Sequence, residues 1–348
     1  MIYEIISKYH LLSVRDKHHR FKSWEHCNNF FIKHKGNLED ENLFDYSCLQ
    51  LAFYLASWRM MRGSTFLLQK DYRIHEYFIK NVAMNDKYKK YYSLLKDSSI
   101  NIEDVDGIDE LIKDTAKVYV DNIKDINGEK TVVSVTDTLT SKILLGVYGI
   151  VPAYDSYFVN AIKMYGFRNT TLCEDSLKEL VNFYYDFQSE FEACRVLFEK
   201  DGVQYPPMKL IDMYFWQVGY MLDKTQNYQE EELQRICEFA NLYKMKNKQT
   251  IQKKRKEKYP NSINREEKAT GLKEEITSYI LSLLEKAAKD GLLVFEISSG
   301  QIHKAMKLKD RFPSVCNAMV KINEYPHEII KDTASGKSST KIVRYYLK

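Results

Sequence analysis

Lys142 and Asp155 are the residues whose types and spacing come closest to a catalytic pair in this sequence. The stretch from Lys142 to Lys163 reads as an apolar helix, a Gly-Ile-Val-Pro break and a second amphipathic helix that opens at Asp155. An aspartate at a helix N-terminus accepts hydrogen bonds from free backbone N–H groups, and its charge suits the positive helix end. A carboxylate beside a lysine can also serve acid–base or nucleophilic chemistry. Both interpretations stay open, and the local pattern favours the helix cap.

A second candidate is a pair of arginines, Arg59 and Arg62, in the stretch RMMRGST. Their spacing of three predicts that they share one side of a helix, and the Gly63-Ser-Thr sequence that follows can end this helix and cap the next. Two guanidinium groups beside a helix N-terminus would form an anion-binding site. The alternative, which we favour, is a tight helix crossing at Gly63, with both arginines either extending their charged ends to solvent or paired to acidic residues of the body.

Three other polar residues lie in segments with helical spacing. Asp71 and His75 are four apart and could form an acid–base pair on one helical face. Asp212 lies in YPPMKLIDMYFWQVGYML, whose aromatic stripe is typical of a core rather than of a base-stacking surface, and it would matter if buried. No glycine-rich nucleotide loop or zinc-protease motif is present, so the sequence predicts neither a cofactor nor a metal site.

The charges are distributed unevenly along the chain. Residues 244–348 contain 23 basic and 12 acidic residues, a net +11, whereas the preceding 243 residues carry a net −7. This asymmetry indicates an acidic body and a basic C-terminal part that is suited to bind a polyanion such as DNA. Residues 244–271 hold 10 basic and 3 acidic residues and few apolar ones, which predicts an extended or partly helical basic linker. A solvated spacer is the alternative.

A small α+β domain is predicted after this linker. A helix with Ile276, Ile280 and Leu284 on one face can end at Gly291, and LVFEIS is a short strand candidate. Ser298 or Ser299 can cap a short helix, and Pro313 suits the first turn of the next one. Two strands around a Gly- and Ser-rich hairpin tip complete the order helix, strand, helix, helix, strand, strand.

This order resembles the winged-helix family, a variant of helix-turn-helix, over about 75 residues. The run SSGQIHKAMKLKDRFPSVCNAM, followed by a wing ending in IVRYYL, is similar to small C-terminal modules of bacterial restriction-type and HNH-nuclease-associated proteins. The outward face of the second helix would present residue types that contact base edges or phosphates, and the wing would add lysines near the DNA backbone. The predicted DNA-binding residues are Ser314, Asn317 and Lys321, with Ala318 beside them, and Lys331, Lys337 and Lys341 in the wing. Docking of a partner protein is the alternative role.

Residues 136–166, TDTLTSKILLGVYGIVPAYDSYFVNAIKMYG, resemble a segment of helix-hairpin-helix DNA glycosylases. In that family a lysine-bearing helix leads through a proline-containing loop to an essential aspartate at a helix N-terminus. By position, Asp155 matches the aspartate, and Lys142 loosely matches the lysine that some members use as a nucleophile. The glycine-rich hairpin is replaced here by VVSVTDTLTS, which removes the backbone amides that would hold a DNA phosphate, and the iron–sulfur cysteines are absent.

The sequence as a whole predicts a mainly α fold, with a helical body over residues 1–243, the basic linker and the winged-helix domain over 272–348. Residues 175–202 are predicted to form one long amphipathic helix that stops at Gly202. Scattered cysteines, no signal peptide and no apolar run of about 18 residues predict a cytoplasmic protein without a membrane span.

The leading functional hypothesis is a protein of restriction, phage defence or regulation that binds double-stranded DNA. One alternative is a nucleic-acid-processing enzyme, glycosylase-like or nuclease-associated, in which Asp155, Lys142, Arg59 and Arg62 line a pocket of the body. Another is a protein-interaction scaffold, and a homo-oligomer or a partner protein is compatible with each hypothesis. Three body segments, 53–72, 136–158 and 205–222, also resemble bacterial proteins of similar size from defence or mobile regions, but this resemblance carries over no activity.

Overall fold

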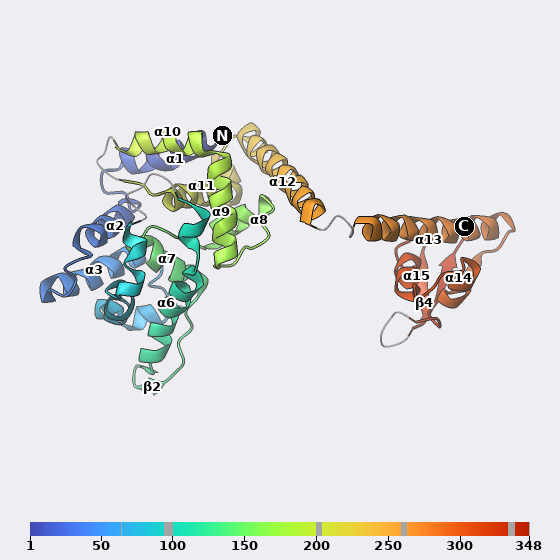
Figure 1. The fold of residues 1–348 in the computed structure, drawn as a ribbon, viewed down its shortest axis with the longest axis horizontal. Helices are drawn as coiled ribbons and strands as arrows, with labels where there is room; N and C mark the ends of the chain where they lie inside the picture. The colour runs from blue at the N-terminus through green and yellow to red at the C-terminus, as the bar shows by residue number, and fades with distance from the viewer. Residues whose placement is uncertain (64, 94–99, 200–203, 259–262, 333–337, 348) are drawn as a thin grey trace. The chain divides into compact units, whose positions relative to one another are not determined.

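In the computed structural model the chain folds into two compact units, Met1–Lys248 and Gln249–Lys348 (Figure 1). The structure describes all residues except 64, 94–99, 200–203, 259–262, 333–337 and 348. The first unit, called the body below, is helical, and the second contains a three-stranded antiparallel sheet. The prediction of a mainly α fold with a small α+β part is therefore confirmed. The boundary between the units lies inside the segment predicted to be a linker.

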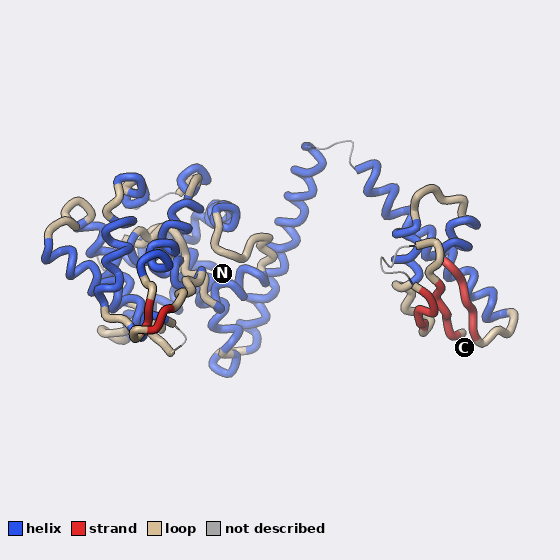
Figure 2. The backbone as a smooth tube through the Cα atoms, turned by 90° about the horizontal axis from the view of Figure 1, so that it is seen from below, coloured by secondary structure: helices blue, strands red, loops and turns tan. Residues whose placement is uncertain are grey.

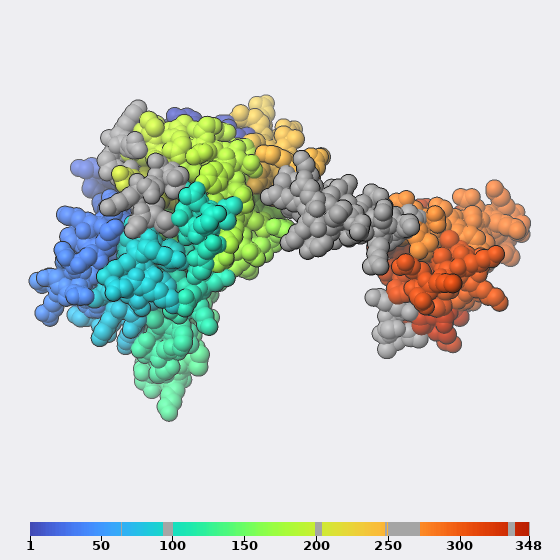
Figure 3. All heavy atoms as spheres, viewed as in Figure 1, coloured from blue at the N-terminus to red at the C-terminus, as the bar shows by residue number. Residues whose placement is uncertain are grey.

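Helices of 9 to 17 residues make up most of the body, and many of their buried side chains join one core. They are α1 (Ile2–Arg15), α2 (Lys22–His34), α3 (Glu41–Ser57), α6 (Ile108–Asn122), α7 (Asp137–Val147), α8 (Ser156–Met164), α9 (Glu174–Asp186), α10 (Gln188–Glu199) and α11 (Pro207–Asp223). Two short helices, α4 (Glu76–Phe78) and α5 (Lys90–Ser93), connect some of them. The two-residue strands β1 (Asp125–Ile126) and β2 (Glu129–Lys130) form a hairpin at the tip of a projection of the body (Figures 1 and 3).

Helix α11 is buried along most of its length. It packs against α8, α1, α9 and α10, and its aromatic side chains, Tyr214, Phe215 and Trp216, lie in the core as the sequence predicts. Its closest neighbour is α8, where Gly219 lies against the backbone of Tyr157. A Cβ atom at Gly219 would lie 2.1 Å from the Tyr157 carbonyl oxygen. Only glycine permits this crossing, since real Cβ atoms do not approach backbone so closely.

The long helix predicted over residues 175–202 is instead two helices. Phe187 leaves the helical region, with φ −130° and ψ 27°, between the end of α9 and the start of α10. Its ring packs against Phe183, with 5.0 Å between the ring centroids, and lies 6.0 Å from the ring of Tyr243 in helix α12 (Glu230–Lys258). Packing of this half-buried ring against the distant helix α12 therefore outweighs the local helical pattern. Gly202 lies outside the described residues.

The basic segment 244–271 is largely helical. Helix α12 (Glu230–Lys258) runs from the body into this segment, and α13 (Ile263–Lys289) begins before the segment ends. The partly helical form of the predicted linker is thus confirmed.

The second unit has the predicted order of elements after α13. These elements are β3 (Val294–Ser298), α14 (Ser299–Ala305), α15 (Phe312–Met319), β4 (His327–Lys331) and β5 (Ile342–Tyr346). Strand β5 lies between β3 and β4 and pairs antiparallel with both (Figure 2). Ser298 and Gln301 form a capping box at α14, and Pro313 occupies the first turn of α15. Ile276, Ile280 and Leu284 of α13 are fully buried, and Gly291 follows the helix with φ +81°.

None of the helices in the described part of the chain is both long and apolar enough to cross a bilayer. The same residues contain no cluster of three or more histidine, cysteine or acidic side chains arranged to hold a metal ion.

Candidate functional site

A cleft of about 650 Å³ in the body brings together the four residues proposed to line a pocket. Lys142, Asp155, Arg59 and Arg62 all border it. They come from α7, from the start of α8 and from the segment that follows α3. Convergence of these residues from three separate segments is the arrangement expected of an anion-binding or catalytic site.

Lys142 and Asp155 form a buried ion pair at this cleft. Lys142 is 5% exposed, and its Nζ lies 3.7 Å from Oδ2 of Asp155 and donates a hydrogen bond of 3.1 Å to the carbonyl oxygen of Trp58. Asp155 also caps α8, because its Oδ1 accepts a hydrogen bond of 3.2 Å from the Phe158 N–H. The predicted cap is therefore confirmed, and the same carboxylate faces the lysine.

Burial shifts the pKa values of both groups toward their uncharged forms. Removal from water lowers the pKa of Lys142, and the opposing attraction of Asp155 is smaller. Removal from water likewise raises the pKa of Asp155, against the effects of Lys142 and the Phe158 N–H. A larger share of Lys142 is therefore uncharged than for a lysine in water, and an uncharged amine can act as a nucleophile.

The loop that carries Asp155 is held at both ends. Gly149, with φ 68°, ends α7, and its N–H donates to the carbonyl oxygens of Leu144 and Leu145. Farther along, the N–H of Tyr154 donates to Oγ of Ser141 at 2.8 Å, and the Tyr154 carbonyl oxygen accepts from Thr138 at 2.8 Å. Helix α7 therefore fixes the loop that leads from Lys142 back to Asp155.

The backbone around the two arginines differs from the prediction. Helix α3 ends at Ser57, and Arg59 adopts a left-handed conformation with φ 61°, so the arginines do not share a helical face. A crossing at Gly63 is also wrong, because a Cβ atom there would meet nothing within 4 Å. The chain turns because Met60 is buried and its carbonyl oxygen accepts a hydrogen bond from the Thr65 hydroxyl at 2.7 Å. Arg59 and Arg62 are exposed as a result.

Aromatic rings line the cleft beside the charged groups. Trp216 stacks on Tyr220 with an interplanar angle of 9° and meets Tyr157 edge-on. Trp58 also lines the cleft, and the guanidinium of Arg20 lies 4.8 Å from its ring centroid. Within the described part of the chain, Nε1 of Trp58 is a buried donor without a hydrogen-bond partner. Such a group favours a water or a ligand that can accept its hydrogen bond.

Sequence reasoning missed several cleft residues. Arg20 and Trp58 come from separate segments, and no local pattern links them to Lys142. The aromatic stripe that includes Trp216 predicts a core rather than a base-stacking surface, and Trp216 is indeed 5% exposed, yet its ring also borders the cleft. Asp212 was named as important if buried, and it is 4% exposed. The sequence signal for its partner is Lys209, three residues earlier in an otherwise apolar helix.

Asp71 and His75 do not form the predicted acid–base pair. Asp71 is exposed and caps a short 3-10 helix (Tyr72–His75) through a hydrogen bond from the Arg73 N–H at 2.8 Å. His75 is fully buried, and its Nδ1 lies 2.8 Å from the hydroxyl of Tyr119. Because the 3-10 turn directs these side chains to different environments, His75 joins the core.

The predicted DNA-binding residues of the second unit have mixed positions. Asn317, Lys321 and Lys331 are exposed, and Ser314 is half-buried. Two expectations are wrong. Ala318 is fully buried in the unit's core, and Lys341 is 5% exposed and forms an ion pair of 2.8 Å with Asp332, which removes its charge from the surface. Lys337 lies outside the described residues.

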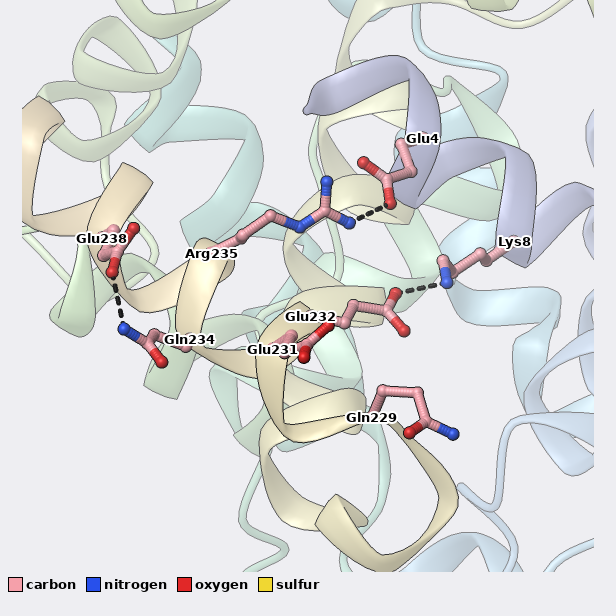
Figure 4. A pocket seen from close by; sticks show the side chains of 8 residues that line it. All are labelled: Glu4, Lys8, Gln229, Glu231, Glu232, Gln234, Arg235 and Glu238. Carbon is pink, nitrogen blue, oxygen red and sulfur yellow. Dashed lines mark hydrogen bonds and ion pairs between the residues drawn. The ribbon is translucent and has the colours of Figure 1, made fainter.

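Another surface groove of the body lies between α1 and the start of α12 (Figure 4). Both of its basic side chains are paired with acidic ones: Lys8 with Glu232, and Arg235 with Glu4 at 2.7 Å. These pairs join the two helices, and the described residues that line the groove include no histidine, cysteine, serine or threonine.

No protein-family model, curated protein or solved structure matches the chain. The function is therefore argued from the geometry of the cleft and of the second unit.

Proposed function

We propose that this protein is a nucleic-acid-processing enzyme that acts on a single nucleotide bound in the body cleft. The observation that carries the proposal is the buried Lys142–Asp155 pair at a cleft that also presents cations and aromatic rings. A lysine with a lowered pKa at such a place is suited to covalent catalysis. The glycosylase-like order of Lys142, a proline-containing loop and Asp155 supports the same reaction class.

The composition of the cleft matches the parts of a nucleotide. Guanidinium groups of Arg59 and Arg62 suit a phosphate, since each can donate two parallel hydrogen bonds to it. Faces of aromatic rings such as Trp216 and Tyr220 suit a base, and stacking contributes about 1–3 kcal/mol per base. A volume of about 650 Å³ falls in the range of pockets for small ligands. A nucleotide of a duplex would have to leave the base stack to enter.

The proposed reaction breaks the bond between the sugar C1′ and the base nitrogen. Uncharged Nζ of Lys142 attacks C1′, and the electrons of the C1′–N bond pass to the departing base. Asp155 accepts the proton that Nζ loses and delivers a proton to the base. The nitrogen lone pair then opens the sugar ring by breaking the C1′–O4′ bond; Nζ loses its second proton and O4′ gains one, which gives the lysine–sugar imine. Water hydrolyses this imine, which restores the amine and releases a sugar without a base. Proton transfer by a positioned carboxyl group contributes on the order of 100- to 10,000-fold to such a step.

We further propose that the second unit is a winged helix that holds double-stranded DNA, with α15 in the major groove. Asn317 on α15 and Lys321, two residues after its end, are exposed and suit contacts with base edges or phosphates. Of the net +11 beyond residue 243, +7 lies in residues 244–271 and +4 in residues 272–348, so the basic segment would supply most phosphate contacts. An activity of this kind fits a cytoplasmic role in restriction, phage defence or regulation.

Borohydride trapping of a covalent complex tests the proposal. The full chain would be mixed with single-stranded and duplex oligonucleotides that contain damaged or mismatched bases, and the imine would be reduced in place. We expect a cross-linked species with the unsubstituted protein, none with Lys142→Gln, and a loss of roughly 100-fold or more with Asp155→Asn. Lys163→Gln, an exposed lysine of α8, is the matched control and should behave as the unsubstituted protein. Base release that persists in Lys142→Gln would overturn the assignment of the nucleophile, and no adduct or base release with any substrate would overturn the proposed function.

A further inference from the structure

A second ion pair lies deeper in the body than Lys142 and Asp155. Nζ of Lys209 lies 2.7 Å from Oδ2 of Asp212, and the two side chains are 2% and 6% exposed. Both belong to α11 and are three residues apart. A buried pair of this kind is seldom a source of stability, because the cost of removing two charges from water is comparable to their attraction. Its presence in an otherwise apolar helix therefore calls for another reason.

Asp212 is connected to Asp155 through the backbone of the loop. Its Oδ1 accepts a hydrogen bond of 2.9 Å from the N–H of Ala153, and the N–H of Asp155 donates to the Ala153 carbonyl oxygen at 2.8 Å. One carboxylate oxygen of Asp212 thus holds the loop and the other holds Lys209. The loop position that orients Asp155 depends on this contact.

Lys209 is connected to Lys142 through Trp58. The ammonium of Lys209 lies 5.6 Å from the ring centroid of Trp58, and it also lies over the rings of Trp24 and Tyr9, at 5.1 and 5.5 Å. The carbonyl oxygen of Trp58 in turn accepts the hydrogen bond from Lys142. The cation–π attraction between buried Lys209 and Trp58 therefore helps to hold Trp58 in place, and Trp58 in turn holds Lys142, the proposed nucleophile.

Both ion pairs border one small cavity. Its volume is about 10 Å³, close to the smallest space that holds one water molecule, and Trp58 and Trp216 complete its wall beside the four charged residues. Because so little free space separates the pairs, a change in one pair is expected to be felt by the other.

We infer that Lys209 and Asp212 are positioning residues that together hold Lys142 and Asp155 in their mutual geometry. The inference rests on the proposed function, in which Lys142 and Asp155 act on the nucleotide. Asp212 sets the position of Asp155 through Ala153, and Lys209 sets that of Lys142 through Trp58. One buried pair on α11 thereby aligns two reactive groups that come from α7 and α8.

The test uses pyridoxal 5′-phosphate, an aldehyde that carries a phosphate, as a probe of lysine reactivity in the full-length protein. Imines formed in the cleft are reduced with borohydride, and the modified lysines are assigned by peptide mapping. Lys224 lines the same cleft but pairs with Asp223 at 2.7 Å, so the ratio of Lys142 to Lys224 modification is an internal standard. General loosening of the fold would alter both lysines, whereas a positioning effect alters Lys142 alone.

The main variant replaces the pair by apolar residues of similar size, Lys209→Met with Asp212→Leu, which is expected to leave the fold intact. We expect the ratio of Lys142 to Lys224 modification to fall between about tenfold and about 100-fold, because small misplacements of reactive groups have effects of this size. A crystal structure of the variant should show the Lys142 Nζ–Asp155 Oδ2 separation increased from 3.7 Å. Should the double variant fail to fold, Lys209→Met with Asp212→Asn serves instead, since the amide oxygen can still accept the Ala153 N–H and no buried charge is left unpaired. Only the contact of Lys209 with Trp58 is then lost, and the modification ratio should still fall.

Tyr119→Phe is the matched control, because it breaks another buried polar contact of the body, to His75, away from the cleft. It should lower the melting temperature without changing the modification ratio. An unchanged ratio or an unchanged Lys142–Asp155 separation in the pair variant would overturn the inference. If Lys142 of the unsubstituted protein forms no imine, its role as a nucleophile fails instead, and the positioning role is then decided by the separation in the crystal structure.

Discussion

Arg59 combines exposure, charge and an unusual backbone conformation at the edge of the cleft. A left-handed φ of 61° is unfavourable for a residue with a Cβ atom, and such conformations concentrate at functional sites. The conformation presents Arg59 and Arg62 to the cleft after α3 has ended. The turn in which Arg59 takes up this conformation is fixed by the burial of Met60 and by the hydrogen bond that its carbonyl oxygen accepts from Thr65.

Replacement of Arg59 by glycine should separate stability from binding. We expect Arg59→Gly to raise the free energy of unfolding by about 1 kcal/mol, because glycine adopts this conformation without strain. Affinity for a nucleoside 5′-monophosphate should fall roughly tenfold, since a charge-assisted hydrogen bond is lost. Urea unfolding measures the first effect, and quenching of Trp58 and Trp216 fluorescence measures the second. Arg59→Ala should lose the same affinity for the nucleotide without a gain in stability, because alanine keeps the Cβ atom. Equal free energies of unfolding for the two variants would show that the backbone at residue 59 is not strained.

His75 makes the stability of the body depend on pH. Burial lowers the pKa of His75 to about 3, from 6.5. Between these values the unfolded chain binds a proton that the folded protein excludes, so stability rises with pH and is lost as the pH falls below 6.5. From pH 6.5 to about pH 5 the loss attributable to His75 should be about 2 kcal/mol. Urea unfolding at several pH values should show this difference between the unsubstituted protein and His75→Gln, and parallel curves would contradict it.

Among the secondary-structure elements, the crossing of helices α8 and α11 positions one wall of the cleft. Tyr157 and Trp216, one on each helix, meet edge-on at the cleft, and Gly219 sets how closely their helices approach. Helix α11 also carries Lys209 and Asp212 beneath the same wall. The geometry of the site is therefore sensitive to the spacing of these two helices.

Gly219→Ala should destabilise the body and disturb the cleft. The new methyl group would meet the carbonyl of Tyr157, which is backbone and cannot turn away, so we expect a loss of roughly 2 kcal/mol or more. Melting temperature and nucleotide affinity should both fall. Gly36→Ala is the control, since a Cβ atom there would meet nothing within 4 Å, and it should change stability by no more than about 0.5 kcal/mol. A Gly219→Ala protein as stable as the Gly36→Ala protein would rule out the tight crossing.

The whole molecule divides its proposed tasks between two units with separate cores. The cleft and its charged pairs lie entirely within Met1–Lys248, while the surplus of positive charge lies beyond residue 243. A reaction on one nucleotide requires a closed cleft, whereas binding to a long DNA requires an extended basic surface. Two separate units can provide one of these each.

Deletion of residues 249–348 should therefore weaken binding to duplex DNA more than it affects the cleft. Fewer phosphate contacts should reduce the dependence of affinity on salt concentration, because fewer counterions are released. The affinity of the shortened protein for a nucleoside monophosphate should stay within about threefold of the full chain, a difference below 1 kcal/mol. Titrations of both ligands at several salt concentrations measure these effects. Unchanged duplex affinity would exclude the second unit as the DNA-binding part.

Local rules of sequence determined the identity and order of most elements in this protein. Asp155, Ser298 and Pro313 begin helices, and Gly291 follows one, because each satisfies backbone groups or torsions within a few residues. The helix, strand, helix, helix, strand, strand order of the second unit depends on such local signals and was predicted correctly. So was the burial of the aromatic residues of α11, which depends on helical periodicity.

Only the tertiary structure decided which of these residues meet. Arg59 reaches the cleft through a turn that depends on the burial of Met60, Phe187 breaks a helix to join the core, and Lys341 is buried against Asp332. The pairing of Lys142 with Asp155 beside Arg59 likewise depends on contacts between distant segments. Hydrogen-bond and torsional preferences act within a few residues, so they can be predicted from the sequence. The identity of the distant side chains that a residue contacts depends on every segment that packs around it, so these contacts are defined only once the chain has folded.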